Sequence, residues 1–160
     1  MSRPFTSAWW FPVARLASIA LGFDHGGWCP QGRLAEDGAI PPRYRMSETT
    51  SRDYEVRTES NVASSDGTLI LYRRELSGGT ELTYRLALRH DKPHLLVDLE
   101  QDPDTRLAQE WIGKHKIEVL NVAGPRESTE PGIEFAACRF VGAVLSRRDQ
   151  LATQGKPSGA

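Results

Sequence analysis

The sequence predicts a three-layer, Rossmann-like α/β domain in which helices cover both faces of a mostly parallel sheet. From residue 66 onward, short runs of branched apolar residues alternate with segments whose apolar residues recur at helical spacing. The runs are apolar on both faces in their middle, as strands buried between two helical layers require. The repeated order of strand and helix implies right-handed crossovers and therefore parallel strands.

The predicted core strands are 68–72 (TLILY), 94–99 (HLLVDL) and 117–123 (IEVLNVA). A further short strand is expected near Phe23, just before the stretch HGGWCPQGRLAEDG at 25–38. That stretch holds too many glycine and proline residues for a helix or a long strand, so we expect it to be an ordered loop.

Two helices are expected between these strands. The first spans 80–90 and follows a Gly-Gly pair, with Thr80 as its N-cap. The second begins after Asp102, whose side chain can cap it, and Pro103 suits its first turn because proline lacks the N–H that a helix start leaves unused.

The last helix is expected after Gly132 and should end near Ser146, where its apolar stripe stops. We therefore expect a single domain over 1–148, with an atypical N-terminal segment at 1–13. The polar residues 149–160 are expected to form a flexible tail.

Composition limits the classes of function. Twenty Lys and Arg against twenty-one Asp and Glu give a formal net charge of -1, so no global field attracts nucleic acid or an anionic membrane. Pro12 and Arg15 interrupt the N-terminal apolar run, and no stretch reaches the roughly 20 apolar residues of a bilayer span. The two cysteines, Cys29 and Cys138, form no CxxC pair, which suits the reducing cytosol and argues against zinc. We expect a cytoplasmic protein without nucleic-acid, membrane or metal binding of its own.

The loops that follow the strands are the candidate site, because ligands of such sheets bind beyond the carboxyl ends of the strands. The GGT stretch at 78–80 opens a helix, so backbone N–H groups and the Thr80 hydroxyl can reach an oxyanion. The GPR stretch at 124–126 offers close backbone approach and a guanidinium that can bind two oxygens, as can Arg33. Together these loops predict an anionic, phosphate-bearing ligand.

Several candidates have a structural alternative. A Gly-Gly pair before a helix is often only a tight turn, and Trp28 is explained equally well as a lid over the core. Cys29 lacks a positioned base and is expected to be inert. Asp66 either caps the preceding short helix or faces the ligand crevice. Glu81 is the acid beside the anion-binding turn and hence the weak candidate for proton transfer.

The strings HGGWCPQGRLAEDGAIPPRY, RTESNVASSDGTLIL, SGGTELT and LNVAGPRESTEPGI follow one another as successive motifs. In their order and spacing, the chain from about Leu21 to Leu145 resembles the family called putative molybdenum carrier. That family is a branch of the Rossmann-like superfamily that also holds the lysine-decarboxylase-like phosphoribohydrolases. The resemblance implies a compact cytosolic homo-oligomer that binds the molybdenum cofactor (molybdopterin), which is a pterin phosphate, or a related nucleotide.

Carried over residue by residue, the resemblance implies a ligand site drawn from four motifs. The implied ligand contacts are Gly26, Gly27, Trp28 and Arg33; Asn61, Asp66 and Gly67; Gly78, Gly79, Thr80 and Thr83; and Asn121, Gly124, Pro125, Arg126 and Glu127. Glu36, Asp37, Arg57 and Ser128 also match the motifs. Glu36 and Asp37 either bind a cation or ribose hydroxyls or form an exposed acidic turn, which is the default expectation; Arg57 and Ser128 are assigned no ligand contact.

The beginning of the chain departs from the family pattern. The family starts with a strand that ends in an SGGQTG-type turn followed by an aspartate–arginine pair, whereas this chain reads FTSAWWFPVARL. Because of this difference, the first strand and its glycine-rich turn are expected to be altered or missing. The change matters because the first strand of such a sheet is central. Either the native start site or reading frame differs, which we favour, or TSAWWFPV fills the slot as an extended segment. Pro12 argues against the second explanation because it cannot donate to a central ladder.

Two functions of different classes follow. The first is a non-catalytic carrier for the molybdenum cofactor or a related phosphorylated pterin or nucleotide, with 78–80 and 124–126 on the phosphate. It is favoured because the loops are rich in donors and hold no convincing nucleophile and base. The alternative is a hydrolase of a nucleotide or nucleotide-derived N-glycosidic bond, in which Glu81 polarises water or the ribose. The related hydrolases carry a PGGxGTxxE turn, from which the shorter SGGTELT departs.

Overall fold

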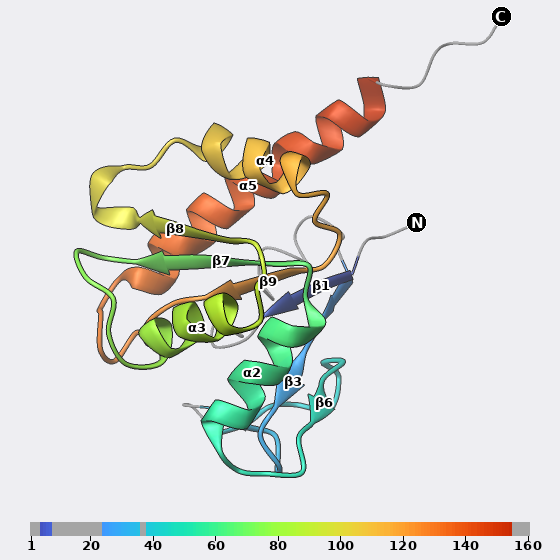
Figure 1. Ribbon diagram of the computed structural model, residues 1–160, viewed down its shortest axis with the longest axis vertical. Helices are drawn as coiled ribbons and strands as arrows, with labels where there is room; N and C mark the ends of the chain where they lie inside the picture. The colour runs from blue at the N-terminus through green and yellow to red at the C-terminus, as the bar shows by residue number, and fades with distance from the viewer. Residues whose placement is uncertain (1–3, 8–23, 36–37, 155–160) are drawn as a thin grey trace, which may run out of the picture.

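The computed structural model describes residues 4–7, 24–35 and 38–154 and has the three predicted layers (Figure 1). Within these residues, the middle layer is a five-stranded parallel sheet of order β2-β1-β9-β7-β8. Its strands are β1 (Pro4–Ser7), β2 (Asp24–Gly26), β7 (Gly67–Tyr72), β8 (His94–Asp98) and β9 (Leu120–Ala123).

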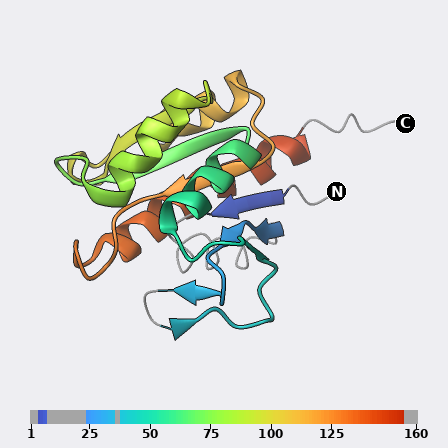
Figure 2. The same cartoon turned by 60° about the horizontal axis from the view of Figure 1, so that its bottom comes forward.

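Helices cover both faces of this sheet. They are α2 (Tyr54–Ser64), α3 (Gly78–Arg89), α4 (Thr105–Lys114) and α5 (Ile133–Gln154), and the 3₁₀ turn η1 (Leu99–Gln101) follows β8. Figure 2 shows α2 and α3 on one face and α5 on the other. Helix α4 packs beside α5, where Gln109 Nε2 donates to the carbonyl oxygens of Ala143 and Val144 at 3.4 and 3.3 Å.

The predicted core strands are confirmed, except that β8 ends at Asp98, before Leu99, and β9 starts later than expected. That strand begins at Leu120 instead of 117 because the N–H groups of Glu118 and Val119 donate to Asp66 Oδ2, at 3.0 and 2.7 Å. Strand β7 is buried at every position except its last, as its two-sided apolar pattern predicts.

The helix ends differ from the predicted ones. Ser77, and not Thr80, is the N-cap of α3. Asp104, and not Asp102, caps α4 by accepting the Arg106 N–H, whereas Asp102 adopts the left-handed conformation that ends η1. Helix α5 continues to Gln154, so the predicted end near Ser146 is wrong, and 149–154 are helical where a tail was expected. Nothing in the sequence between those points breaks a helix, and the next glycine is Gly155.

A strand fills the slot of the family's first strand. β1 lies in the middle of the sheet, where Phe5 is opposite His25 of β2 and Leu120 of β9. The slot is therefore altered in sequence and not missing. Pro4 stands at the first strand position, where its lack of an N–H is tolerated. The rest of the atypical segment, including Pro12, lies outside the described residues.

The glycine-rich stretch is ordered and contains only very short strands, in agreement with the expectation that it forms no helix and no long strand. β3 (Trp28–Cys29) pairs in parallel with β6 (Ser47–Glu48), and β4 (Leu34–Ala35) pairs antiparallel with β5 (Gly38–Ala39). Cys29, Ile40 and Tyr44 form a small buried cluster under this region, with Met46 packed against it.

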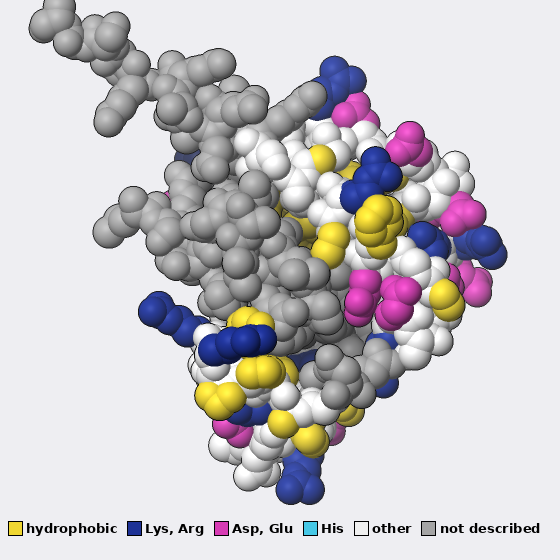
Figure 3. Space-filling model, turned by 180° about the vertical axis from the view of Figure 1, so that it is seen from behind, with side chains coloured by type: hydrophobic (Ala, Val, Ile, Leu, Met, Phe, Trp, Pro, Cys, Tyr) yellow, Lys and Arg dark blue, Asp and Glu magenta, His cyan; other side chains and the backbone are white. Residues whose placement is uncertain are grey.

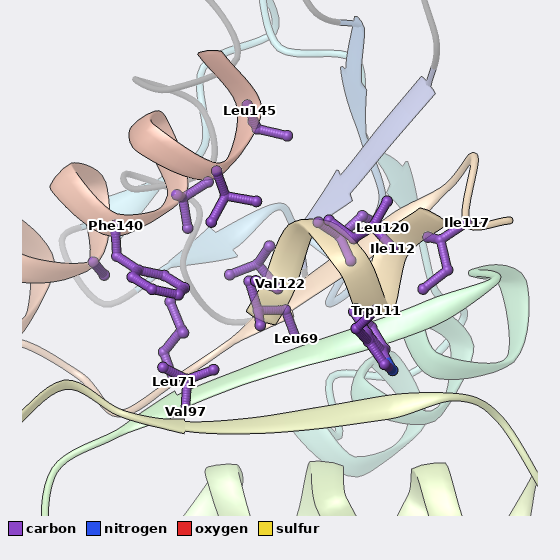
Figure 4. Packing of buried hydrophobic residues seen from close by; sticks show 14 of the residues in the cluster. Leu69, Leu71, Val97, Trp111, Ile112, Ile117, Leu120, Val122, Phe140 and Leu145 are labelled. Atoms are coloured by element: carbon purple, nitrogen blue, oxygen red, sulfur yellow. The ribbon is translucent and has the colours of Figure 1, made fainter. Parts of the chain in front are cut away.

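The main core lies between the sheet and the α4–α5 layer. Figure 4 shows Leu69 of β7 and Val122 of β9 in the cluster that Trp111 and Ile112 of α4 and Phe140 of α5 complete. A smaller cluster of Val62, Leu86 and Ala87 lies on the other face, between α2 and α3. None of the helices in the described part of the chain is long and apolar enough to cross a membrane.

Candidate functional site

The carboxyl edge of the sheet brings residues of all four predicted motifs together. Because all the strands are parallel, Gly26 at the end of β2, Tyr72 at the end of β7 and Ala123 at the end of β9 lie at one edge. Helix α3 begins at this edge. Helix α2 also begins toward it, because the end of α2 leads into the opposite, amino end of β7.

Two arginines converge at this edge on the ring of Tyr54, the first residue of α2. The Cζ atom of Arg57 lies 5.0 Å from the ring centroid, and the Cζ atom of Arg126, from the loop after β9, lies 5.4 Å from it. Arg57 is only 6% exposed, whereas Tyr54 is exposed to solvent. We call Arg57 and Arg126 the arginine pair.

The electrostatics of the arginine pair favour an anion. Burial lowers the pKa of Arg57 to about 10; the positive charge of Arg126 acts in the same direction, and Tyr54 and Cys29 act in the opposite one. Arg57 therefore stays charged at neutral pH while lying close to a second cation. An anion bound between them would reduce this repulsion and form hydrogen bonds to guanidinium groups, which match the geometry of a phosphate.

The start of α3 is a second place for an oxyanion. Gly78 and Gly79 form the first helical turn, and Gly78 has a φ of 53°. The Ser77 side chain makes no capping hydrogen bond, whereas Asp53 and Asp104 cap α2 and α4. N–H groups at an uncapped helix start can bind an oxyanion.

Two threonines of this motif are buried within helix α3. The Thr83 hydroxyl donates to the Gly79 carbonyl within the helix, at 2.8 Å, and its ligand contact stays a prediction. Thr80 is almost completely buried, and its N–H donates to the carbonyl of Ser77. Backbone N–H groups at the start of α3 are therefore better candidates than either hydroxyl.

Asn61 joins the glycine-rich stretch to α2 through hydrogen bonds to backbone groups. Its Oδ1 accepts the Trp28 N–H, its Nδ2 donates to the Trp28 carbonyl, both at 3.0 Å, and Nδ2 also donates to the Arg57 carbonyl. The side chain is completely buried. The predicted ligand contact of Asn61 is therefore replaced by a structural one that fixes Trp28, whose side chain is half-buried, beside the helix that carries Arg57.

Arg33 holds its own loop together. Its guanidinium donates to the carbonyl oxygens of Ile40, Pro41, Tyr44 and Met46, at distances between 2.7 and 3.4 Å. These bonds use four of its five N–H groups, so one N–H group remains for the two ligand oxygens that the sequence predicted it to bind. A loop without regular ladders needs such a partner for its carbonyls.

Asp66 and Gly67 lie at the amino edge of the sheet, away from the arginine pair. The Asp66 carboxylate binds the segment before β9, so it neither caps α2 nor faces the carboxyl-edge crevice. A Cβ on Gly67 would lie 2.5 Å from Cδ1 of Ile117 and 3.1 Å from Cη2 of Trp111. The structure gives both residues a role in packing and backbone hydrogen bonding and does not bring them together with the arginine pair.

Two predicted contacts in the last motif are also structural. The Glu127 carboxylate accepts the N–H groups of Gly132 and Glu134 at the start of α5, and these bonds lower its pKa. Asn121 is buried within the sheet, where its Nδ2 donates to Thr68 Oγ1 at 3.3 Å, and its Oδ1 accepts no hydrogen bond from the described residues.

The remaining predicted ligand contacts are glycine and proline residues at the carboxyl edge, which would contact a ligand through their backbone. Gly26 ends β2, and Gly27, with a φ of 138°, leads into β3. Gly124 and Pro125 follow β9 directly and carry the chain to Arg126. Glu36 and Asp37 lie outside the described residues.

The groups that could perform catalysis are poorly placed for it. The Glu81 carboxylate lies on the exposed side of α3 in an ion pair with Arg85. Cys29 is a buried free thiol whose pKa is raised by burial and by Glu48, against the effect of Arg33 and Arg57. No group of three or more His, Cys, Asp and Glu side chains suited to a metal ion occurs among the described residues.

Sequence reasoning missed the role of Tyr54 and Arg57. Arg57 matched a motif but was given no ligand contact, because the helix that carries it was expected only as a short segment. The available signal was an aromatic residue and an arginine three positions apart, at the start of a helix that leads into a core strand.

Comparisons with known proteins agree with this fold. Residues 13–145 match the family model described as circularly permutated YpsA SLOG family. The structure is similar to the crystal structure of a protein named putative molybdenum carrier protein from Syntrophus aciditrophicus SB, with a TM-score of 0.83 and 36% sequence identity. The similarity covers 90% of this chain and 95% of that chain. A search of curated proteins found no match.

Proposed function

The chain belongs to the circularly permuted YpsA family of SLOG proteins, and on this premise we propose that it is a non-catalytic binding protein for an anionic, phosphate-bearing ligand. The name of the similar crystal structure connects that protein with molybdenum. We propose as ligand the molybdenum cofactor or a related phosphorylated pterin or nucleotide. The observation that carries this proposal is the convergence of Arg57 and Arg126 on one ring at the carboxyl edge.

The arginine pair fits a phosphate group in charge and in access. Arg57 is a buried cation. Arg126 is half-buried in the loop after β9. Tyr54 is exposed, so a ligand can reach the cluster from solvent. The phosphate binds the two guanidiniums, and the uncapped start of α3 supplies further N–H donors at the same edge.

The hydrolase alternative has less support. A general base must reach the proton that it abstracts, and Glu81 is instead paired with Arg85 on the exposed side of α3. The thiol of Cys29 stays protonated at neutral pH because burial raises its pKa. Both observations fit a protein that holds its ligand unchanged, and the free cysteines fit a place in the reducing cytosol.

The test is calorimetric titration of the protein with inorganic phosphate, AMP and molybdenum cofactor, in parallel with thermal unfolding. A ligand at 100 times its Kd should stabilise the fold by about 2.7 kcal/mol, a rise in Tm of roughly 5–10 °C for a chain of this size. Arg126→Gln should raise Kd roughly 10–100-fold, since it removes a charged hydrogen-bond donor.

Arg89→Gln is the matched control, because it removes a guanidinium from the last turn of α3, at the opposite edge. It should bind like the parent. Equal affinity of Arg126→Gln and the parent would refute the site, and no response of the parent to any of the three ligands would refute the function. Release of free adenine from AMP, lost in Glu81→Gln, would support the hydrolase instead.

A further inference from the structure

Arg73 joins three loops at the carboxyl edge of the sheet. It directly follows β7, and its guanidinium donates to the carbonyl oxygens of Pro131 and Gly132 in the loop after β9, at 3.1 and 3.4 Å. Its Nε also lies 3.9 Å from a carboxylate oxygen of Glu100 in η1, which follows β8. In Figure 3 this edge lies on the right, where Lys and Arg side chains lie among Asp and Glu side chains. One side chain therefore connects the loops that follow β7, β8 and β9.

The loop that Arg73 binds is the one that carries Arg126 of the arginine pair. The Arg126 carbonyl accepts the N–H groups of Thr129 and Glu130, at 3.0 and 2.9 Å. These bonds close a turn directly after Arg126. The backbone of Arg126 is thereby connected to the part of the loop whose carbonyls Arg73 holds.

The far end of this loop is fixed by a second charged side chain. Glu127, next to Arg126, accepts the N–H groups of Gly132 and Glu134 at the start of α5. Gly132 is therefore held from two sides, its N–H by Glu127 and its carbonyl by Arg73. A displacement of Gly132 would be passed through these bonds to the backbone beside Arg126.

Arg126 needs such an anchor because a second cation lies close to it. Arg57 and Arg126 both lie beside the ring of Tyr54, and like charges repel each other. Arg57 is almost completely buried on α2, whereas Arg126 lies in a loop, so repulsion would displace Arg126 more easily. Hydrogen bonds from a charged donor are stronger than neutral ones, and Arg73 supplies two of them to the loop.

We propose that Arg73 is a positioning residue of the ligand site, which holds the loop after β9 so that Arg126 stays beside Arg57, without contacting the ligand itself. The effect on affinity rests on the proposed function, whereas the effect on the loop exists without a ligand. A phosphate that binds both guanidiniums then meets a site that is organised before binding, so less ordering opposes the association.

The first test follows the loop in the ligand-free protein by amide hydrogen exchange, measured by NMR. Arg73→Gln should speed the exchange of the Thr129 and Glu130 N–H groups about 3–10-fold, because the charged donors that hold the loop are lost. Arg74→Gln is the matched control and should leave this exchange unchanged. Among the described residues, the Arg74 guanidinium binds Glu100 alone, at 3.5 Å, and its side chain is 79% exposed.

Thermal unfolding checks that both variants are folded. The carbonyls that Arg73→Gln leaves free are exposed to water, which can replace the lost donors. Each variant should therefore unfold within about 2 °C of the parent.

The second test measures affinity by calorimetric titration with inorganic phosphate, AMP and the molybdenum cofactor. Arg73→Gln should raise Kd about 3–10-fold. Arg73→Lys should raise it less, because lysine keeps the charge but not the paired N–H groups. In an Arg126→Gln background, Arg73→Gln should cause no further loss, because it acts through Arg126. A role in general stability would instead give the same factor in both backgrounds.

The possible failures are distinguishable. Unchanged exchange in Arg73→Gln, or equal factors in the two backgrounds, would overturn this proposal and leave the ligand site intact. A parent that binds none of the three ligands would refute the proposed function and the effect on affinity together, whereas hydrogen exchange would still decide whether Arg73 holds the loop.

Discussion

Replacing Gly67 with alanine is expected to destabilise the protein, although glycine-to-alanine changes in strands usually do not. The new Cβ would lie 2.5 Å from Cδ1 and 3.2 Å from Cγ1 of Ile117, and 3.1 Å from Cη2 of Trp111. Comfortable carbon–carbon contacts are about 3.5–4.0 Å. Ile117 and Trp111 belong to the main core, so neither has free space to move into.

The expected magnitude is the difference of two effects. Overpacking of a core costs about 1–3 kcal/mol, whereas the loss of unfolded-chain freedom returns about 0.4–1 kcal/mol. The net loss of about 1–2 kcal/mol lowers Tm by roughly 2–8 °C for a protein of this size. Thermal unfolding followed by circular dichroism measures it, with Gly113→Ala as control. At that α4 position no described atom lies within 4 Å of a new Cβ, so Tm should rise slightly.

The contact itself can be tested with Ile117→Val, which removes the Cδ1 atom nearest to the new methyl group. Alone, this change should cost about 0.5–1.5 kcal/mol. Combined with Gly67→Ala, it should cost about 1 kcal/mol less than the sum of the two single changes, because the clash is relieved. Additive losses, or a Gly67→Ala protein as stable as the parent, would refute this explanation and reopen a ligand role for Gly67.

Two other predictions test the structural roles of Asn61 and Glu127. Asn61→Ala should lower the free energy of unfolding in urea by about 2–3 kcal/mol, because the partly buried N–H and carbonyl of Trp28 lose their partner. A loss of less than about 0.5 kcal/mol, as is usual for surface changes, would contradict this role. The lowered pKa of Glu127 means that its carboxylate stabilises the fold above the unfolded pKa of about 4.3, and that this contribution is lost as pH falls through the folded pKa. The Tm difference between the parent and Glu127→Gln should therefore be largest near about pH 7 and become smaller as the pH falls below about 4.3, and a constant difference would contradict it.

The sheet was predictable because its strands are buried on both faces. An uninterrupted apolar run such as 68–72 has few structural alternatives once helical segments flank it. The helix ends were harder, because two aspartates, Asp102 and Asp104, could each cap α4. The choice depends on where η1 ends after β8, which is decided by tertiary contacts and not by local sequence.

The site was only partly predictable, for a reason that Arg33 and Asn61 illustrate. A polar side chain in an irregular loop can bind a ligand or can satisfy the backbone of the loop, and the sequence pattern is the same in both cases. Arg33 and Asn61 bind backbone groups. The location of Arg126 was predictable from its place after a strand, but its convergence with Arg57 joins segments distant in the sequence.

The central position of β1 also determines the order in which the chain can fold. Phe5 pairs with Leu120, so the middle of the sheet closes only after most of the chain has been synthesised. Contacts between residues so far apart are slow to form because a long loop must close first. We therefore expect β7, β8 and β9 with their helices to associate early, leaving one side of β9 open for β1 to complete the sheet. Until β9 has been synthesised, the edges of β1 and β7 that it will join stay unpaired, and such open strand edges are prone to aggregation.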